Sequence, residues 1–232
     1  MVKKIVGTGV LLVLALALQA GVKMYTLKSP DGKVKLEVTA GQGIAYSLFY
    51  DGRLLLKPSR IALHTDLPEA DHWENIRITG TKQRHVSETV QAPFYRVKEF
   101  GIDCNELELR LNNGFSLLMR AYNDGMAYRF VAGRKGEMTV VEERAEFNFA
   151  DDFEAYIPYS TNPKDPWNMA FQNFYTKAPL TQYNTELPAF LPLTVDAGAV
   201  KLTLLESDLE AYPGMFVCGD GKTPALKGVF AA

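Results

Sequence analysis

Residues 33–39 read KVKLEVT, a strict alternation of charged or polar side chains with valine or leucine. Successive side chains of a β-strand point to opposite faces, so this segment predicts a strand with one face on a core and the other in water. The same period of two recurs in residues 44–50 and 106–111. Such alternation is typical of antiparallel sheets, which often keep one solvated face.

Turn-forming pairs separate these segments. An aspartate or asparagine followed by glycine tolerates the positive φ angles of tight hairpin turns. The pairs are Asp31-Gly32, Asp51-Gly52, Asn113-Gly114, Asp124-Gly125 and Asp220-Gly221. Because no long stretch of helical periodicity follows the first twenty residues, the sequence predicts an all-β fold.

The composition is that of a globular protein rather than a disordered one. The chain has 232 residues, of which 47% are hydrophobic and 22% charged, and this length suits one large β-domain with its own core. The net charge of -2 leaves no basic surface of the kind that nucleic-acid-binding proteins carry. We therefore expect no nucleic-acid partner.

The N-terminus carries a targeting signal. Lys3 and Lys4 precede the apolar residues 5–18, and small residues follow where a signal peptidase cuts. The apolar run is shorter than the ~20 residues that span a bilayer, so residues 1–20 are predicted to be a cleaved signal peptide. The alternative is an uncleaved anchor. The first interpretation predicts an exported domain over residues 21–232, periplasmic or on the cell surface, with no membrane span after processing.

Cys104 and Cys218 are the two cysteines of the chain. Export permits a disulfide between them, but burial as two free thiols is the commoner fate of such cysteines. His64, His72 and His85 show no paired metal-ligand spacing with each other or with the cysteines. A zinc site is not predicted.

Residues 156–192 break the alternation and are rich in aromatic residues and proline. A long segment with few strand signals is typical of a functional surface loop or lid. The alternative is a loop that folds its aromatic residues back onto the sandwich. The aromatic residues of this segment include Tyr159, Trp167 and Tyr175.

Five segments in a fixed order extend over nearly the whole chain after the signal. They are residues 27–33 (LKSPDGK), 45–59, 120–130 (RAYNDGMAYRF), 142–147 (EERAEF) followed by 156–158, and 187–193 (LPAFLPL) leading into 201–209. Together they resemble the N-terminal domain of glycoside hydrolase family 97, a family of secreted α-glucosidases and α-galactosidases of Bacteroidetes.

The resemblance implies a β-supersandwich of antiparallel sheets, similar to the galactose mutarotase fold. Glycoside hydrolysis needs two carboxyl groups, and in this family both belong to a catalytic (β/α)₈ barrel that follows the N-terminal domain. The chain, which ends at Phe230-Ala231-Ala232, looks truncated before that barrel. No catalytic residue is therefore assigned here, and we expect the chain alone to be inactive. The expected function is to support the barrel of an exo-acting α-glycosidase that acts on oligosaccharides. Trp167, Tyr159 and Tyr175 are candidates for stacking on sugar rings, whose flat apolar faces suit aromatic platforms.

The resemblance also implies a calcium ligand. The family's N-terminal domain lends one carboxylate to an active-site calcium ion, from a segment similar to residues 205–209 (LESDL), where Glu206 holds the matching position. Glu206 ends a largely apolar strand predicted over residues 199–205. Calcium takes six to eight oxygen ligands, so calcium binding is expected in the complete enzyme and is expected to be weak or absent in this chain alone. The alternative is a solvated acidic strand end formed by Glu206, Asp208 and Glu210.

Two other functions fit an all-β chain. A stand-alone carbohydrate-binding or structural sandwich needs no barrel. An epimerase needs a histidine base and a glutamate in one concave face, and the three scattered histidines give it little support. Arg120 and Arg129, which flank the turn at Asp124, are better explained by ion pairs or exposed strand positions than by an anion site.

Overall fold

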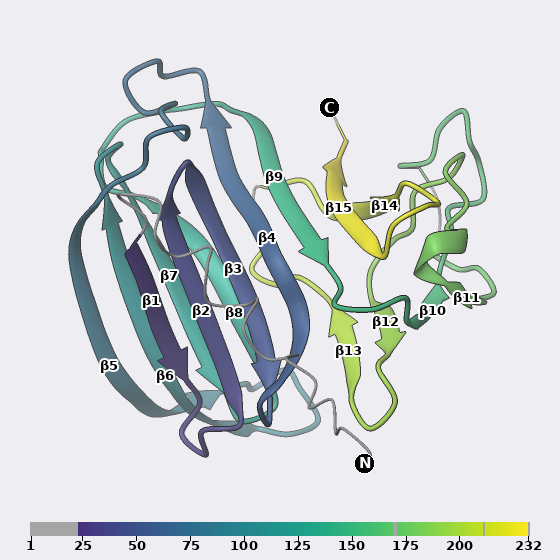
Figure 1. Ribbon diagram of the computed structural model, residues 1–232, viewed down its shortest axis with the longest axis horizontal. Coiled ribbons are helices and arrows are strands. Elements are labelled where there is room, and N and C mark those ends of the chain that lie inside the picture. Colours follow the sequence, from purple (N-terminus) through teal and green to yellow (C-terminus); the bar gives the residue numbers. More distant parts are fainter. Residues whose placement is uncertain (1–22, 169–170, 211, 232) are drawn as a thin grey trace, which may run out of the picture.

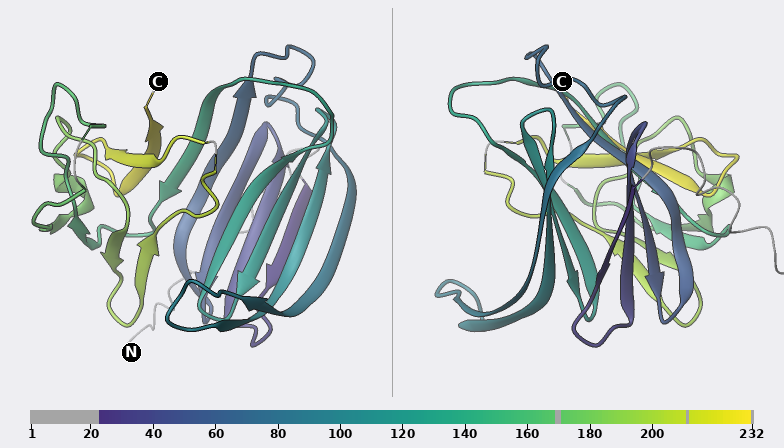
Figure 2. Two further views of the ribbon diagram at one scale, coloured as in Figure 1. Left: turned by 180° about the vertical axis from the view of Figure 1, so that it is seen from behind. Right: turned by 60° about the vertical axis from the view of Figure 1, so that its left-hand side comes forward.

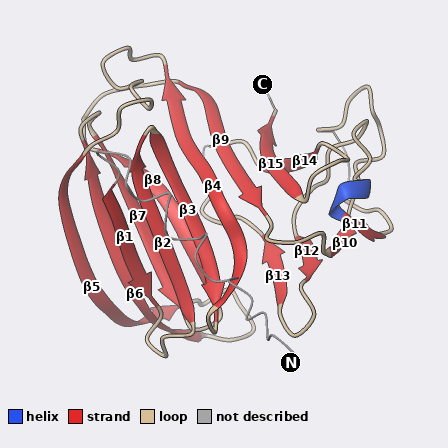
Figure 3. Ribbon diagram, in the orientation of Figure 1, coloured by secondary structure: helices blue, strands red, loops and turns tan. Residues whose placement is uncertain are grey.

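The alternating pattern folds into antiparallel β-strands (Figure 3). The computed structural model describes residues 23–168, 171–210 and 212–231, so the expected signal peptide lies outside it. The strands are β1 (Lys23–Lys28), β2 (Val34–Gly41), β3 (Gly43–Tyr50), β4 (Arg53–Thr65), β5 (Ile78–Gln91), β6 (Glu99–Leu111), β7 (Phe115–Tyr122), β8 (Gly125–Ala132), β9 (Val140–Asn148), β10 (Glu154–Ile157), β11 (Thr176–Pro179), β12 (Leu193–Asp196), β13 (Lys201–Leu204), β14 (Met215–Gly219) and β15 (Ala225–Phe230). A short 3₁₀-helix, η1 (Leu180–Gln182), follows β11. The all-β prediction is confirmed.

Two sheets form a sandwich. One has seven strands in the order β1-β2-β3-β4-β9-β15-β14, and the other has four in the order β5-β6-β7-β8. Figure 2 shows β5–β8 facing β1–β4 and β9 as two layers. The core between them takes the inward residues of the alternation, among them Leu36, Val38, Leu109 and Leu117, all fully buried. The sequence therefore predicted which face of these strands is covered.

The hairpins form at the predicted turns. Asp51 and Gly52 have φ angles of 48° and 79°, the left-handed pair that a two-residue hairpin turn requires. β3 and β4 consequently pair directly across it, with Tyr50 opposite Arg53.

A smaller sheet, in the order β11-β10-β12-β13, stands beside the sandwich (Figure 1). Ala189 joins it to β14 through isolated bridges to Tyr159 and Val217. Strands of four residues are too short to show a period of two, so the interpretation of residues 156–192 as one long loop missed β11. Leu180, Tyr183 and Phe190 are buried here. This half of the segment folds back onto the domain, which was the second of the two alternatives.

Candidate functional site

Glu206 lies in the loop that connects β13 to β14, residues 205–214. The apolar strand predicted just before it is observed as β13, which ends at Leu204. The Glu206 side chain is half-buried, and both its carboxylate oxygens accept the backbone N–H of Met215 at 2.9 Å. The carboxylate is thus held by the first residue of β14.

The Met215 amide is free to do this because β14 is an edge strand of its sheet. Alternate amides of a strand point to the same side. The Val217 N–H, two residues further on, donates to the carbonyl of Ala189 at 2.8 Å, and the Glu206 carboxylate takes the matching position opposite Met215. A Cβ on Gly214 would lie 3.3 Å from Glu206 Oε1, so the glycine leaves room for the carboxylate.

A second carboxylate, that of Glu143, lies nearby. Glu143, Ala145 and Phe147 are two residues apart along β9, so their side chains lie on the same face of the sheet. Ala145 and Phe147 are buried in the sandwich, so the Glu143 side chain also points to the inner face. Burial raises the pKa of Glu143, the Tyr212 hydroxyl lowers it, and the negative charge of Glu206 raises it again. The pKa of Glu206 is raised by burial and lowered by the Met215 amide.

Neither carboxylate forms an ion pair in the part of the chain that the structure describes. Tyr212 donates its hydroxyl to Glu143 Oε2 at 2.7 Å, and the half-buried phenol of Tyr128 is close enough for Glu143 to raise its pKa further. Among the ion pairs of the described residues, none involves Glu143 or Glu206. Burial without a basic partner disfavours the charged form of both carboxylates, whereas a nearby cation favours it.

The same pair is too small to hold a metal ion by itself. In the part of the chain that the structure describes, no three His, Cys, Asp or Glu side chains are grouped closely enough to do so. Calcium needs six to eight oxygen ligands, so these two glutamates do not form a calcium site by themselves. Sequence reasoning missed Glu143, although its parity with Ala145 and Phe147 marks it as an inward glutamate.

The predicted sugar-stacking residues are placed differently from one another. Tyr159 is 7% exposed and accepts the Asn184 N–H at 2.8 Å, so its ring has no open face for a sugar. Trp167 is half-buried and edge-on to Phe216. Tyr175 is 47% exposed. Sugar stacking stays a prediction for Trp167 and Tyr175, while the burial of Tyr159 points to a structural role.

The outer face of the four-stranded sheet carries an ion network. Glu106, 5% exposed, accepts Arg84 Nε at 2.6 Å and Arg120 Nε at 2.8 Å. Burial raises the pKa of Glu106, but the two guanidinium groups outweigh it and hold that pKa below its usual value. The exposed Arg129 lies 3.6 Å from Asp208. Arg120 and Arg129 therefore form ion pairs, as the sequence analysis predicted.

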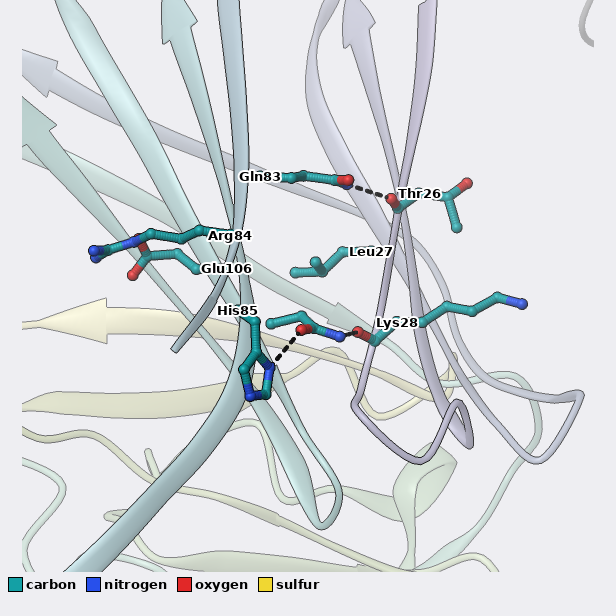
Figure 4. A pocket seen from close by; sticks show the side chains of 8 residues that line it. Thr26, Leu27, Lys28, Gln83, Arg84, His85 and Glu106 are labelled. Carbon is teal, nitrogen blue, oxygen red and sulfur yellow. Dashed lines mark hydrogen bonds and ion pairs between the residues drawn. The ribbon is translucent and has the colours of Figure 1, made fainter. Parts of the chain in front are cut away.

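A cleft of about 480 Å³ opens along the edge of the sandwich between β1 and the strands β5 and β6 (Figure 4). Gln83 and Asn105 reach across it and donate to the carbonyls of Thr26 and Lys28 at 2.9 Å and 2.8 Å. These amides satisfy the outward carbonyls of an edge strand, which otherwise invite pairing with another chain. At this cleft the two amide side chains cover the exposed edge of β1. Glu206 is not among the residues that line it.

The histidines and cysteines do not converge on a site. His64 pairs with Asp71, and His85 contacts Asn105 and Asp103. Cys104 and Cys218 are both free, as predicted, with Cys104 buried and Cys218 half-buried. No helix in the described part of the chain has the length and apolar character needed to cross a membrane.

Solved structures with the same fold are glycosidases. A glycoside hydrolase family 97 enzyme from Pseudoalteromonas sp. strain K8, in complex with acarbose, matches with a TM-score of 0.74 at 18% identity, over 89% of this chain and 32% of that one. A beta-arabinopyranosidase matches with a TM-score of 0.76 at 20% identity, over 90% of this chain and 35% of that one. The chain therefore has the fold of about one third of each of these two larger proteins.

Sequence comparison identifies the particular family. The model described as Glycosyl-hydrolase 97 N-terminal matches residues 27–231, and the chain belongs to this family. A retaining alpha-galactosidase of Bacteroides thetaiotaomicron is 39% identical over 223 residues, which is 93% of this chain and 33% of that protein. A probable retaining alpha-galactosidase of Streptomyces bingchenggensis is 26% identical over 158 residues, which is 66% of this chain and 24% of that protein. The chain thus spans a third or less of the length of the curated relatives that it matches.

Proposed function

We propose that residues 21–232 form the N-terminal domain of an exported, exo-acting α-glycosidase, an α-galactosidase or α-glucosidase, in which they support a catalytic (β/α)₈ barrel. The family membership supports this role, and the relatives named as retaining alpha-galactosidases make an α-galactoside the first substrate to test. The observation that carries the proposal is the half-buried carboxylate pair, Glu206 and Glu143, which lacks a basic partner among the described ion pairs.

In this proposal Glu206 lends one carboxylate to a calcium ion at the junction with the barrel. A bound divalent cation supplies positive charge that polarises substrate oxygens or stabilises developing negative charge. Glu206 meets the requirement because the Met215 N–H uses only part of its acceptor capacity, and a carboxylate has about four lone-pair sites. Glu143 keeps the surroundings negative, which favours a cation over an anion.

The substrate class follows from the relatives. One Pseudoalteromonas enzyme was solved with panose and with acarbose, so we propose an oligosaccharide substrate for the complete protein. Trp167 and Tyr175 then lie on the surface segment that offers aromatic contacts to it. Neither catalytic carboxyl group is assigned to this chain, and we expect no turnover from it alone.

A domain-exchange chimera tests the proposal. Residues 27–231 replace the matched N-terminal region of the Bacteroides retaining alpha-galactosidase, and hydrolysis of an aryl α-galactoside is measured with calcium and with a chelator. The expected result is calcium-dependent hydrolysis by the chimera and none by the isolated chain. A chimera that folds, binds no calcium and is indifferent to chelation would contradict the calcium role. Sugar binding by the isolated chain with no activity in the chimera would instead favour a stand-alone carbohydrate-binding domain.

A further inference from the structure

Apart from the bonds of Glu206 to Met215, the described residues 205–210 of the loop before β14 are weakly attached to the rest of the domain. Leu205 is 66% exposed and buries little apolar surface, and Leu209, at 40% exposed, is only partly covered. Asp208 reaches Arg129 at 3.6 Å, but both side chains are well exposed, and exposed ion pairs of this kind contribute little. Contacts of this kind alone would let the loop open easily.

Tyr212 provides a stronger attachment. Its ring lies edge-on to Phe230 of β15, with ring centroids 5.9 Å apart. Its hydroxyl donates to Glu143 Oε2 at 2.7 Å, and hydrogen bonds to carboxylates are among the stronger ones in proteins. This contact joins the loop to the inner face of β9, two residues along that strand from the fully buried Ala145.

The attachment lies close to Glu206 along the chain. Tyr212 is three residues before Met215, whose amide both oxygens of Glu206 accept. Gly214, between them, approaches Glu206 so closely that a Cβ there would crowd the carboxylate. Tyr212 therefore anchors the chain to β9 only three residues before the amide that holds Glu206.

We propose that Tyr212 and Glu143 are positioning residues that clamp the loop of residues 205–214 onto β9, so that the Glu206 carboxylate is held ready for its metal ion. The role of Glu143 is to accept the tyrosine hydroxyl and not to bind the ion. The link between the clamp and calcium binding rests on the proposed function. The clamp itself can be tested without calcium.

Hydrogen exchange of this chain in the presence of a chelator measures the clamp directly. Tyr212→Phe keeps the ring on Phe230 and removes the hydroxyl, and we expect the amide of Met215 to exchange roughly tenfold faster. The matched control is Tyr159→Phe, which removes another tyrosine hydroxyl whose partner is the Asn184 amide and leaves Met215 unchanged. Protection across β7 reports whether each variant remains folded.

Rescue by a conservative variant separates positioning from metal binding. Glu143→Gln retains an oxygen acceptor for Tyr212 and is expected to keep most of the Met215 protection, whereas Glu143→Ala is expected to lose it as Tyr212→Phe does. Wild-type exchange in Tyr212→Phe, or equal loss in Glu143→Gln and Glu143→Ala, would overturn the clamp.

The link between the clamp and calcium binding is tested by measuring the calcium Kd of the chimera. Tyr212→Phe should raise the calcium Kd several-fold and leave kcat at saturating calcium near that of the unsubstituted chimera. An unchanged Kd with faster Met215 exchange would overturn the link between the clamp and the ion. A chimera without any calcium binding would instead contradict the proposed function, and the exchange result would still decide the clamp.

Discussion

Glu206→Gln in the chimera is the most direct perturbation of the proposed calcium site. The substitution preserves the shape of the side chain and one oxygen, so the hydrogen bond from the Met215 amide survives. It removes a negative charge that burial already disfavours and that raises the pKa of Glu143. The metal-free fold should therefore tolerate the change, while calcium loses an anionic ligand.

The size of the effect follows from general metal-site energetics. Changing even an outer partner of a metal ligand costs about 10–100-fold in affinity, so removing the charge of a direct ligand should cost about 100-fold, equivalent to about 2.7 kcal/mol. At a calcium concentration 100 times the original Kd, binding stabilises the site by about 2.7 kcal/mol, and this falls to about 0.4 kcal/mol in Glu206→Gln.

Calorimetric titration of calcium gives the Kd, and melting of the metal-free protein controls for folding. Asp208→Asn is the matched control, because Asp208 lies two residues away, is well exposed and faces Arg129 instead of Glu143. We expect it to change the Kd less than threefold. Equal calcium affinity in Glu206→Gln and the unsubstituted chimera would return Glu206 to a solvated acidic strand end and refute the reasoning.

Three further predictions concern processing, stability and sugar binding. The mature chain should begin between about residues 18 and 24, and mass spectrometry of exported material that finds an intact Met1 would contradict this. Glu106→Gln should lower the free energy of unfolding by about 2 kcal/mol, because Glu106 loses its charge between Arg84 and Arg120; urea melts measure it. Because the pKa of Glu106 is lowered in the folded state, its contribution is present above the unfolded value of about 4.5 and should vanish as the pH falls through the lowered pKa. A difference in stability between Glu106→Gln and wild type that does not shrink as the pH is lowered below 4.5 would be inconsistent with this linkage. Trp167→Ala and Tyr175→Ala should weaken oligosaccharide binding to the active chimera several-fold, and equal affinities would remove these residues from the site.

Local pattern predicted much of the sandwich. The alternation in residues 33–39 and 106–111 gave both the strands and their buried faces, since inward and outward side chains differ in polarity at a period of two. Short strands such as β11 were not predicted, because four residues are too few to show an alternation of polar and apolar side chains. The family resemblance, which rests on five ordered segments, supplied the candidate Glu206, and the apolar strand before it placed that residue near a strand end.

The sequence by itself determined the all-β class, the turns and the strand-end position of Glu206, because each depends on residues that are neighbours in the chain. The tertiary structure decided that Tyr212 meets Glu143 across 69 positions, that the Met215 amide faces Glu206 at a free sheet edge, and that Tyr159 is buried while Tyr175 is exposed. Those contacts depend on how β9, β14 and β15 pack together. Side-chain periodicity records the face on which a residue lies, but not which distant residue it meets there.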